Sequence, residues 1–513
     1  MPFQKKRSLA IVGGGAAGVA TFIAAVQHRV AQAIYILEPK YIGPGIAFSN
    51  LDSDILCNTS VDTMSVVEDN PLDFLDYLHK IGHIVTPESF VPRQWVGDYL
   101  NERFLEFSAI AYKVGIRVFH IPHLVRRLKI NSHRRYTLWH GNVFTPQHLE
   151  VTDVIFCTGA GASRMPKLLQ PHLTHPTFIP CPYPEASMLA KIPPQSRVLV
   201  IGSKLSAIDA AIVLCREGHQ VTMASPSGDI PAVRSRFIRS LGTVFKHENM
   251  RSIMAHKENQ STSSFPDSLK HRYLKYFYRA LKKHTKISWR EQFSNANSYR
   301  ERLREEIAIA EQGKSQWQDI IVNFIDVINA VHLTDKIYFG GSFHPNAEKI
   351  LRRYIGAVAL PNAKKLLQYI DNGSLIIQQG EILNVATEEG ETGTWLVNLG
   401  QDDQSFDAVV AAVGYHRPNF VIDKNRSLEI DVYGHRSEYA VSISPEMAAS
   451  HPYLQEKESI WFVGIPAHRR LWVPNALIVA VNVATRVVKN MMKIDIQVTS
   501  SVNNNEKELE ICE

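Results

Sequence analysis

Residues 9–26 read LAIVGGGAAGVATFIAAV, in which a short apolar run leads into three glycines and then into an alanine-rich stretch. The pattern predicts a buried strand, a tight turn and a helix, with Gly13, Gly15 and Gly18 in the spacing Gly-x-Gly-x-x-Gly. Gly13 permits the turn, Gly15 lets a pyrophosphate approach the backbone, and Gly18 lets the helix pack closely on the strand. The start of the helix adds partial positive charge. The segment therefore predicts a dinucleotide-binding turn.

A second apolar run, Ala33 to Leu37, ends at Glu38, twenty residues after Gly18. We expect this run to be a buried strand and Glu38 to accept hydrogen bonds from a ribose. Strand, glycine turn, helix, strand and acid follow one another as in a βαβ unit, which favours nucleotide binding. A glycine-rich turn that binds nothing is the alternative.

The same order of elements returns later in the chain. Arg197 to Ile201 reads as a buried strand, Gly202 follows it, and residues 205–216 and 220–224 read as a helix and a second strand. Lys204, however, stands where the second glycine is expected. Its side chain either hinders a pyrophosphate or contacts phosphate as a point charge, so a nucleotide site and a degenerate scaffold are both open.

Two dinucleotide folds in one chain predict two cofactors that face each other. Residues 166–194 contain eight prolines, which indicates a linker or crossover. Late in the chain, the apolar runs 407–413 and 460–463 end at Gly414 and Gly464 and read as strands that return to the first fold. The predicted fold class is α/β, with two Rossmann-like dinucleotide-binding domains, the first of them discontinuous, and a helical insert.

The predicted domain boundaries follow from this order of segments along the chain. They are 1–195 for the first segment of an FAD-binding domain, 196–372 for an NAD(P)-binding domain with the helical insert, 373–493 for the second FAD-binding segment, and 494–513 for a disordered tail.

Composition excludes several classes of protein. Of the 513 residues 45% are hydrophobic and 21% charged, which fits a globular protein and excludes a disordered chain, a collagen and a coiled-coil rod. The five cysteines are far apart and form no CxxC pair, which argues against a disulfide framework, a zinc ribbon or an iron–sulfur cluster. No apolar run is long enough for a membrane span, so we expect a cytoplasmic protein.

Single residues support no other chemistry. The 21 histidines include no HExxH or other ligand spacing, so we expect no metal site. The sequence contains no GxSxG motif, so it gives no indication of a hydrolase. Cys57 has no second cysteine within a turn, so a buried thiol is favoured over a redox-active disulfide.

Positive charge is concentrated in one segment. The net charge is +6, but residues 234–290 contain 14 Lys/Arg against 3 Asp/Glu. Such a segment indicates either an anionic ligand or partner, or a solvated basic face. Within it, residues 271–279 interleave bases with aromatics, which could contact nucleic acid; we expect instead a helix that packs its aromatics inward.

The whole pattern resembles the two-dinucleotide-binding flavoproteins. More narrowly, it resembles the bacterial FAD/NAD(P)-binding family that is distantly similar to the N-hydroxylating flavin monooxygenases. The narrower likeness covers about residues 8–490 and rests on 43–48 (GPGIAF), 90–93 (FVPR), 97–100 (GDYL), 202–209 (GSKLSAID), 218–222 (GHQVT) and Trp317.

The resemblance implies which residues contact the cofactors, FAD and NADP (or NAD). They are Gly13, Gly15, Ala16, Gly18, Glu38, Arg93, Gly159, Gly414 and Gly464, and in the second unit Gly202, Lys204, Ala207, Arg234 and Arg236. Two positions depart from the family. Ile465 replaces the Asp that often follows the last glycine, and Ser225-Pro226 stands where some relatives carry an Arg for NADPH. Arg234 and Arg236 are the expected substitutes for that Arg.

The resemblance further implies an NAD(P)H-dependent flavin oxidoreductase, most concretely a monooxygenase that acts through a flavin C4a-hydroperoxide. Its partners would be molecular oxygen and a small polar substrate, an amine or an amino-acid-like metabolite. A flavin-dependent dehydrogenase that inserts no oxygen and a non-catalytic flavoprotein-like binding protein are the alternatives. No side chain is obliged to act as an acid or base, so the sequence names no catalytic residue.

Overall fold

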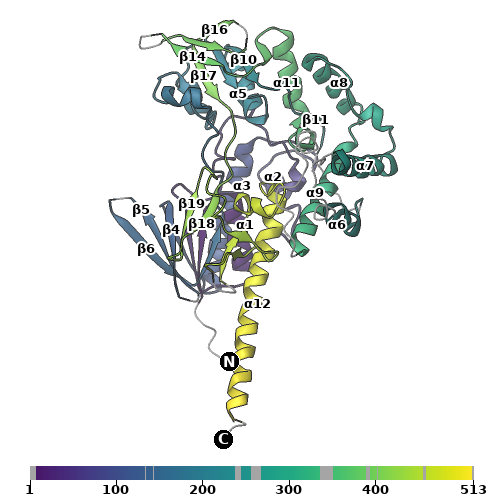
Figure 1. Ribbon diagram of the computed structural model, residues 1–513. Helices are drawn as coiled ribbons and strands as arrows, with labels where there is room; N and C mark the ends of the chain where they lie inside the picture. Colours follow the sequence, from purple (N-terminus) through teal and green to yellow (C-terminus); the bar gives the residue numbers. More distant parts are fainter. Residues whose placement is uncertain are drawn as a thin grey trace.

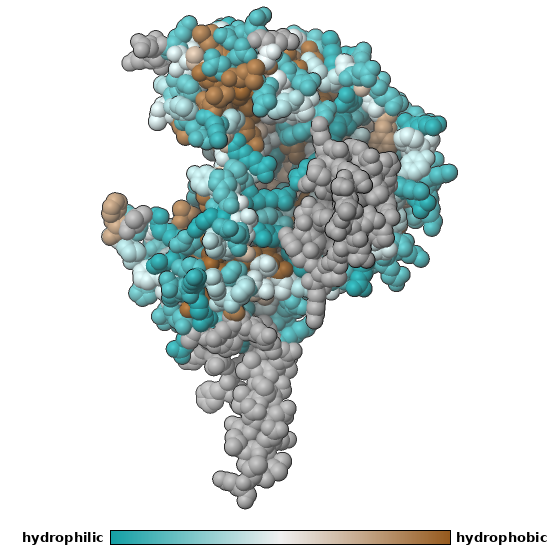
Figure 2. All heavy atoms as spheres, viewed as in Figure 1, coloured by the Kyte–Doolittle hydropathy of each residue, from teal (hydrophilic) through white to brown (hydrophobic). Residues whose placement is uncertain are grey.

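The computed structural model describes residues 7–510 apart from 133, 143, 237–243, 256–266, 336–350, 389–392, 401 and 455–457. Two parallel five-stranded sheets form the upper and lower parts of the molecule, and a helical insert lies at one side (Figure 1). In the space-filling view a deep notch separates the two parts on the side opposite the insert (Figure 2).

The first sheet has the strand order β22-β7-β1-β2-β3. Its members are β1 (Ser8–Val12), β2 (Ala33–Leu37), β3 (Arg117–Ile121), β7 (Asp153–Phe156) and β22 (Ile460–Phe462). Every neighbouring pair is parallel. Strands covered on both faces of such a sheet are mostly apolar, as β1, β2, β7 and β22 are, whereas the edge strand β3 is largely exposed. Its helices are α1 (Ala16–Gln27), α2 (Asp73–Lys80), α3 (Arg93–Lys113) and α12 (Leu477–Glu510).

The second sheet has the order β13-β10-β9-β17-β8 and is again parallel. Its members are β8 (Phe178–Ile179), β9 (Arg197–Ile201), β10 (Gln220–Ser225), β13 (Leu375–Gln379) and β17 (Ala408–Ala411). Its helices are α4 (Glu185–Leu189), α5 (Leu205–Arg216) and α11 (Leu360–Asp371). The predicted duplication of a strand–turn–helix–strand unit is therefore confirmed.

Smaller sheets and the insert complete the fold. An antiparallel sheet of order β18-β19-β4-β5-β6 contains β4 (Val125–Ser132), β5 (Arg135–Gly141), β6 (Pro146–Val151), β18 (Asn419–Ile422) and β19 (Ser427–Asp431). The other short strands are β11 (Val233–Arg234), β12 (Val358–Ala359), β14 (Asn384–Thr387), β15 (Trp395–Asn398), β16 (Asp403–Phe406), β20 (Ser442–Ile443) and β21 (Ala449–Ser450). The insert contains α6 (His247–Ala255), α7 (Asp267–His284), α8 (Tyr299–Glu311) and α9 (Trp317–Thr334). The described residues also contain the 3-10 turns η1 (Val61–Thr63), η2 (Lys167–His172), η3 (Trp289–Gln292) and η4 (Ile465–Arg469).

Two predicted boundaries differ from the structure. We call the first sheet with its helices the first domain, and the second sheet with its helices the second domain. The boundary at residue 372 falls inside the second domain, because β13 and β17 both belong to the second sheet, with β17 directly beside β9. The strand at 407–413 therefore does not return to the first fold, whereas β22 does. The boundary at 195 also shifts, because β8, within the proline-rich crossover, forms the edge of the second sheet.

The C-terminal helix is longer than expected. We predicted a disordered tail from 494, but α12 begins at Leu477 and continues to Glu510 (Figure 1). Its buried residues, among them Val487 and Met491, share one core with α1 and the first sheet. In the described parts of the chain no helix combines the length and the apolar character that a membrane crossing requires.

Candidate cofactor-binding site

The first glycine turn has the geometry that its spacing predicts. Gly13 has a φ of +107°, and a Cβ there would lie 2.6 Å from the Cys157 carbonyl oxygen. A Cβ on Gly18 would lie 2.0 Å from the Gly13 carbonyl oxygen, so only glycine lets α1 approach β1 this closely. These two glycines shape the turn and leave the third, Gly15, for contact with a ligand.

Gly15 is the N-cap of α1, and no side chain caps that helix end. A Cβ on Gly15 would lie 3.6 Å from the Cα of Gly45, so the start of α1 and the loop that contains Gly45 are in close contact. At the same turn, the Gly14 N–H donates to Glu38 Oε2 at 2.9 Å, which places the Glu38 carboxylate at the end of β2 next to the turn. The uncapped helix start, where Ala16 is the first residue, offers backbone N–H groups and partial positive charge to a pyrophosphate.

The second glycine turn accommodates Lys204 without backbone strain. Gly202 has a φ of +129°, and a Cβ there would lie 2.5 Å from the Ala412 carbonyl oxygen. Lys204 is the N-cap of α5 with a φ of −103°, a conformation open to any residue, and no side chain caps this helix either. The Lys204 Nζ donates to the Asp229 carbonyl oxygen at 2.8 Å, so the side chain reaches toward the loop after β10. Ala207, fully buried, packs against Gly202.

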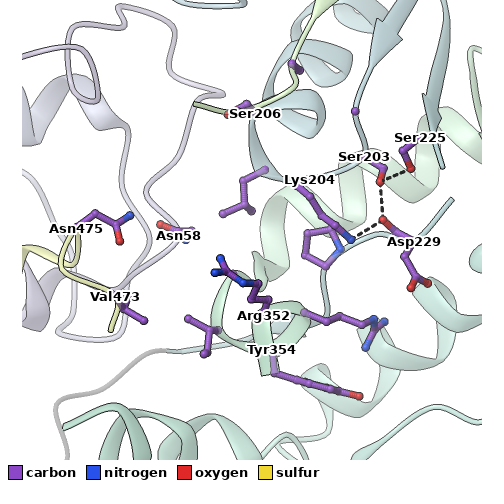
Figure 3. A pocket seen from close by; sticks show the side chains of 18 of the residues that line it. Asn58, Ser203, Lys204, Ser206, Ser225, Asp229, Arg352, Tyr354, Val473 and Asn475 are labelled. Atoms are coloured by element: carbon purple, nitrogen blue, oxygen red, sulfur yellow. Dashed lines mark hydrogen bonds between the residues drawn. The ribbon is translucent and has the colours of Figure 1, made fainter. Parts of the chain in front are cut away.

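A cavity of about 1600 Å³ lies between the two domains. That volume exceeds the roughly 300–1,000 Å³ of a pocket for one small ligand. Four of the predicted site residues line it, namely Arg93, Gly202, Lys204 and Gly414. Figure 3 shows Ser203, Lys204, Ser225 and Asp229 at one end, and Asn58, Val473 and Asn475 at the other, with the Arg352 side chain between them.

Three glycines end strands beside these sites. Gly159 follows β7 and Gly414 follows β17 with a φ of +75°, and a Cβ on either would meet no atom within 4 Å. Both positions are therefore open to a ligand. Gly464, with a φ of +72°, follows β22, and its Cβ would lie 2.9 Å from the Ala17 Cβ, so this turn rests on the first turn of α1. Ile465, in place of the Asp, begins η4.

Arg93 joins the two domains at the cavity wall. Its Nη2 donates to Asp209 Oδ2 at 2.7 Å, and the Tyr183 hydroxyl donates to the same oxygen at 2.6 Å. Burial raises the pKa of the Asp209 carboxyl, while Arg93 and Tyr183 oppose that rise. Burial also raises the pKa of the Cys57 thiol, beside Arg93, to about 12, so Cys57 stays neutral.

Asp209 was missed by the sequence reasoning, although a signal was present. It is the one acid in the apolar helix over 205–216, and an acid in such a helix is buried only when it is paired.

The roles predicted for Arg234 and Arg236 are corrected. Arg234 is fully buried, and its guanidinium donates to the carbonyl oxygens of Asn58 (3.3 Å), Tyr354 (2.6 Å) and Ile355 (2.7 Å). Arg236 pairs with Asp319 of α9 at 2.6 Å. Neither residue lines the cavity. Burial makes Arg234 a brace between loops of the two domains and not a ligand for a 2′-phosphate.

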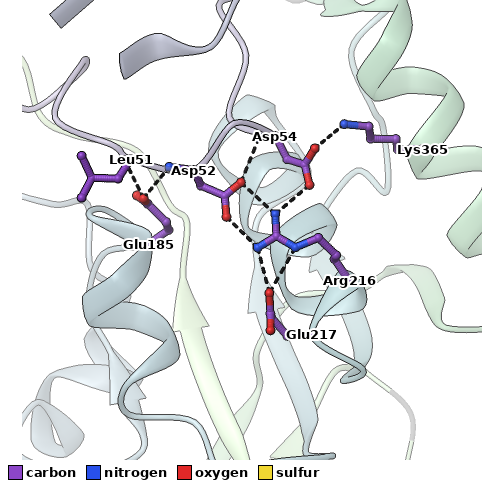
Figure 4. Close-up of polar contacts among 7 residues, drawn as sticks. All are labelled: Leu51, Asp52, Asp54, Glu185, Arg216, Glu217 and Lys365. Atoms are coloured by element: carbon purple, nitrogen blue, oxygen red, sulfur yellow. Dashed lines mark hydrogen bonds and ion pairs between the residues drawn. The ribbon is translucent and has the colours of Figure 1, made fainter. Parts of the chain in front are cut away.

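A second interdomain contact surrounds residues 51–54, a loop of the first domain (Figure 4). Arg216 of α5 donates to Asp52 Oδ2 and to Asp54 Oδ2, each at 2.7 Å, and Lys365 of α11 also donates to Asp54. The backbone N–H groups of Leu51 and Asp52 donate to Glu185 Oε1 at 2.7 and 2.8 Å. The second domain thus holds this loop by side chains from three helices.

Comparisons with known proteins agree with this fold. Residues 10–161 match the FAD-NAD(P)-binding family. No curated protein sequence matches the chain. Among solved structures, the chain is similar to the ornithine hydroxylase of Pseudomonas aeruginosa (TM-score 0.56, 14% identity, covering 95% of this chain and 99% of that one).

Two further structures have the same fold. The ornithine N-hydroxylase of Kutzneria sp. 744, solved with reduced FAD, NADP+ and L-ornithine, gives a TM-score of 0.55 at 12% identity, covering 96% of this chain and 100% of that one. The cadaverine monooxygenase of Erwinia amylovora, solved with FAD, gives 0.52 at 11% identity, covering 95% of each chain. These likenesses confirm the predicted two-dinucleotide-binding architecture over nearly the whole chain.

Proposed function

We propose that this chain is an FAD-dependent NAD(P)H oxidoreductase, and specifically a monooxygenase that acts on a small amine or amino-acid-like substrate. One observation carries the proposal. Two glycine turns begin helices that no side chain caps, and the second turn lines an interdomain cavity large enough for more than one ligand, whose first-domain wall includes Ala47 and Phe48 of the loop that contains Gly45. The FAD-NAD(P)-binding match over residues 10–161 supports nucleotide binding at the first turn.

The first domain would hold FAD. The uncapped start of α1 at Gly15 would bind the pyrophosphate, Glu38 would bind the ribose, and Gly159 and Gly464 would border the rest of the cofactor. Bound FAD and NAD(P)H would supply the hydride transfer and the reaction with oxygen. The protein's part is to align the two cofactors and to exclude water, for which the cavity offers apolar walls at Val322, Ile325 and Leu477.

The second domain would hold NADPH in preference to NADH. The strand β10 ends at Ser225 and is followed by Pro226, so the position that carries Glu38 in the first fold has no acid that would repel a 2′-phosphate. Arg302 lines the cavity beside this strand end and pairs with Asp229 at 2.9 Å. We propose Arg302, with Lys204, as the cations that replace the predicted Arg234 and Arg236.

The opposite end of the cavity would hold the substrate. Asn58 and Asn475 offer amide groups there, and Arg352 extends its guanidinium toward them (Figure 3). Asp326 of α9 adds a carboxylate to the same cavity. A guanidinium and a carboxylate with two amides complement a substrate that carries both an amine and a carboxylate.

The test is the purified protein with FAD, NADPH and a panel of amines and amino acids. We expect yellow protein, NADPH oxidation that consumes oxygen, and a hydroxylated product that matches the oxygen consumed. Flavin reduction without oxygen insertion would replace the monooxygenase by a dehydrogenase. A folded protein that takes up no FAD would refute catalysis and favour a binding protein.

A further inference from the structure

The exposed face of α7 is basic, and neither cofactor site uses it. Lys275, Arg279, Lys282 and Lys283 are exposed, as is Tyr278. Their spacing of three, four, seven and eight residues from Lys275 places all of them on one side of the helix. Part of the local excess of positive charge that the sequence shows is therefore gathered on one face of α7.

The other side of α7 forms its packing contacts. Ala280 and Leu281 are buried in the core of the insert, and the Phe277 ring lies 5.7 Å from that of Phe324 on α9. The predicted inward packing of the aromatics holds for Tyr276 and Phe277 but not for Tyr278, which is exposed. The basic side is consequently the outer side, and α7 lies at the outer edge of the insert (Figure 1). That edge is hydrophilic in the space-filling view (Figure 2).

Residues just after the helix extend the surface. Lys286 and Arg290 are exposed, and the Trp289 ring lies 5.2 Å from that of Tyr278, with Arg290 5.5 Å above it. Tyr278 and Trp289 keep 38% and 36% of their surface exposed. Within the portion of the chain that the structure describes, none of the six cations of this surface forms an ion pair. We call the six cations and two aromatics the α7 face.

We propose that the α7 face binds an anionic lipid surface. Six cations without ion pairs, among which the described stretch 274–291 places a single acid, Glu291, are complementary to negatively charged headgroups. A tryptophan and a tyrosine at the same level supply the amphipathic rings that sit at a membrane interface. The face is the outside of a helix and not a groove, which suits a flat surface better than a nucleic acid strand. This inference does not depend on the proposed enzymatic function.

The experiment is sedimentation of the full-length protein with vesicles at low ionic strength. We expect the wild type to bind phosphatidylcholine vesicles that contain phosphatidylglycerol, to ignore vesicles of phosphatidylcholine alone, and to be released by high salt. Lys282→Glu/Lys283→Glu should weaken binding about tenfold or more, since each basic residue near the surface contributes. Trp289→Ala should weaken it without changing the salt dependence.

The control is Lys113→Glu/Lys191→Glu, which makes the same charge change at two exposed lysines of other elements. It should bind anionic vesicles nearly as well as the wild type. Equal loss in both double variants, with folding verified by circular dichroism, would reduce the effect to net charge and overturn the proposal. So would wild-type binding to a single-stranded oligonucleotide with none to vesicles.

Discussion

Gly15 is the N-cap of α1, at the proposed pyrophosphate position, and a Cβ there would lie 3.6 Å from the Cα of Gly45. Its φ of −73° is one that any residue adopts, so the backbone accepts Gly15→Val. The branched side chain would occupy the space in front of the helix start, and we expect the variant to retain less than about a tenth of the wild-type FAD. Flavin absorbance per folded protein measures this. Ala186→Val, at the start of α4, adds a branched side chain elsewhere and should keep its FAD; normal FAD in Gly15→Val would refute the site.

Arg302 is the side chain on which the proposed nucleotide preference depends. A charged hydrogen bond is worth about 1.5–3 kcal/mol, so Arg302→Ala should weaken NADPH binding roughly ten- to hundredfold and leave NADH unchanged. Stopped-flow reduction of the flavin by each nucleotide measures both constants. Arg300→Ala, on the same helix but paired with Asp371, is the matched control. Equal effects on NADPH and NADH would contradict the role.

Arg234 and Arg236 lie two residues apart, but replacing them should lower the stability of the protein by different amounts. Arg234→Met removes a fully buried donor to three carbonyls, and we expect it to lower the free energy of unfolding by about 3 kcal/mol. Arg236→Met removes a partly exposed ion pair and should cost less than about 1 kcal/mol. Urea unfolding compares them. Similar losses in the two variants would show that Arg234 is not the brace described above.

At the scale of elements, the 51–54 loop predicts how stability depends on pH. The pKa of Asp52 is lowered chiefly by the hydrogen bond from Arg216. Burial raises the pKa of Asp54, but Lys365 and Arg216 outweigh it, so that pKa is lowered too. Carboxyls of this kind stabilise the folded chain above their ordinary pKa of 3.8 and lose that effect as the pH falls through the lower folded value.

Asp52→Asn/Asp54→Asn should therefore be less stable than the wild type at pH 7 and should lose less on acidification below about pH 4. Thermal unfolding across this pH range is the measurement. Asp98→Asn is the control, because burial raises the pKa of this carboxyl. In this variant the loss of stability on acidification should be no smaller than in the wild type. If the stability of the loop variant fell with decreasing pH as steeply as that of the wild type, the ion pairs of Figure 4 would contribute nothing to stability.

An element could be predicted from the sequence where residues close together in the chain decide its structure. The turn at Gly13–Gly18 and its repeat at Gly202 are made by residues adjacent in the chain, so their pattern was sufficient. The sheet that takes up β17 is decided by pairing with β9, some 200 residues earlier, and an apolar strand ending in glycine fits either sheet. For the same reason, nothing near Arg234 in the sequence reveals that carbonyls of Asn58 and Tyr354 surround it.

At the scale of the molecule, each cofactor should protect its own domain. FAD should slow amide hydrogen exchange in β1 and α1 and also in β22 and the start of α12, because these segments form one sheet and one core. NADP+ should instead protect residues 202–206 and the start of α8. Exchange followed by mass spectrometry measures both. Protection by FAD confined to the first 156 residues would contradict the joint contribution of the two distant segments.

The discontinuity of the first domain also has a consequence for biosynthesis. Every strand of the second sheet lies between residues 178 and 411, so that domain is complete before β22 leaves the ribosome. The first sheet, begun at Ser8, waits for Ile460–Phe462 as its edge and for α12 as its cover. A nascent chain would therefore carry a finished second domain beside an open first one, and flavin could be captured only near the end of translation.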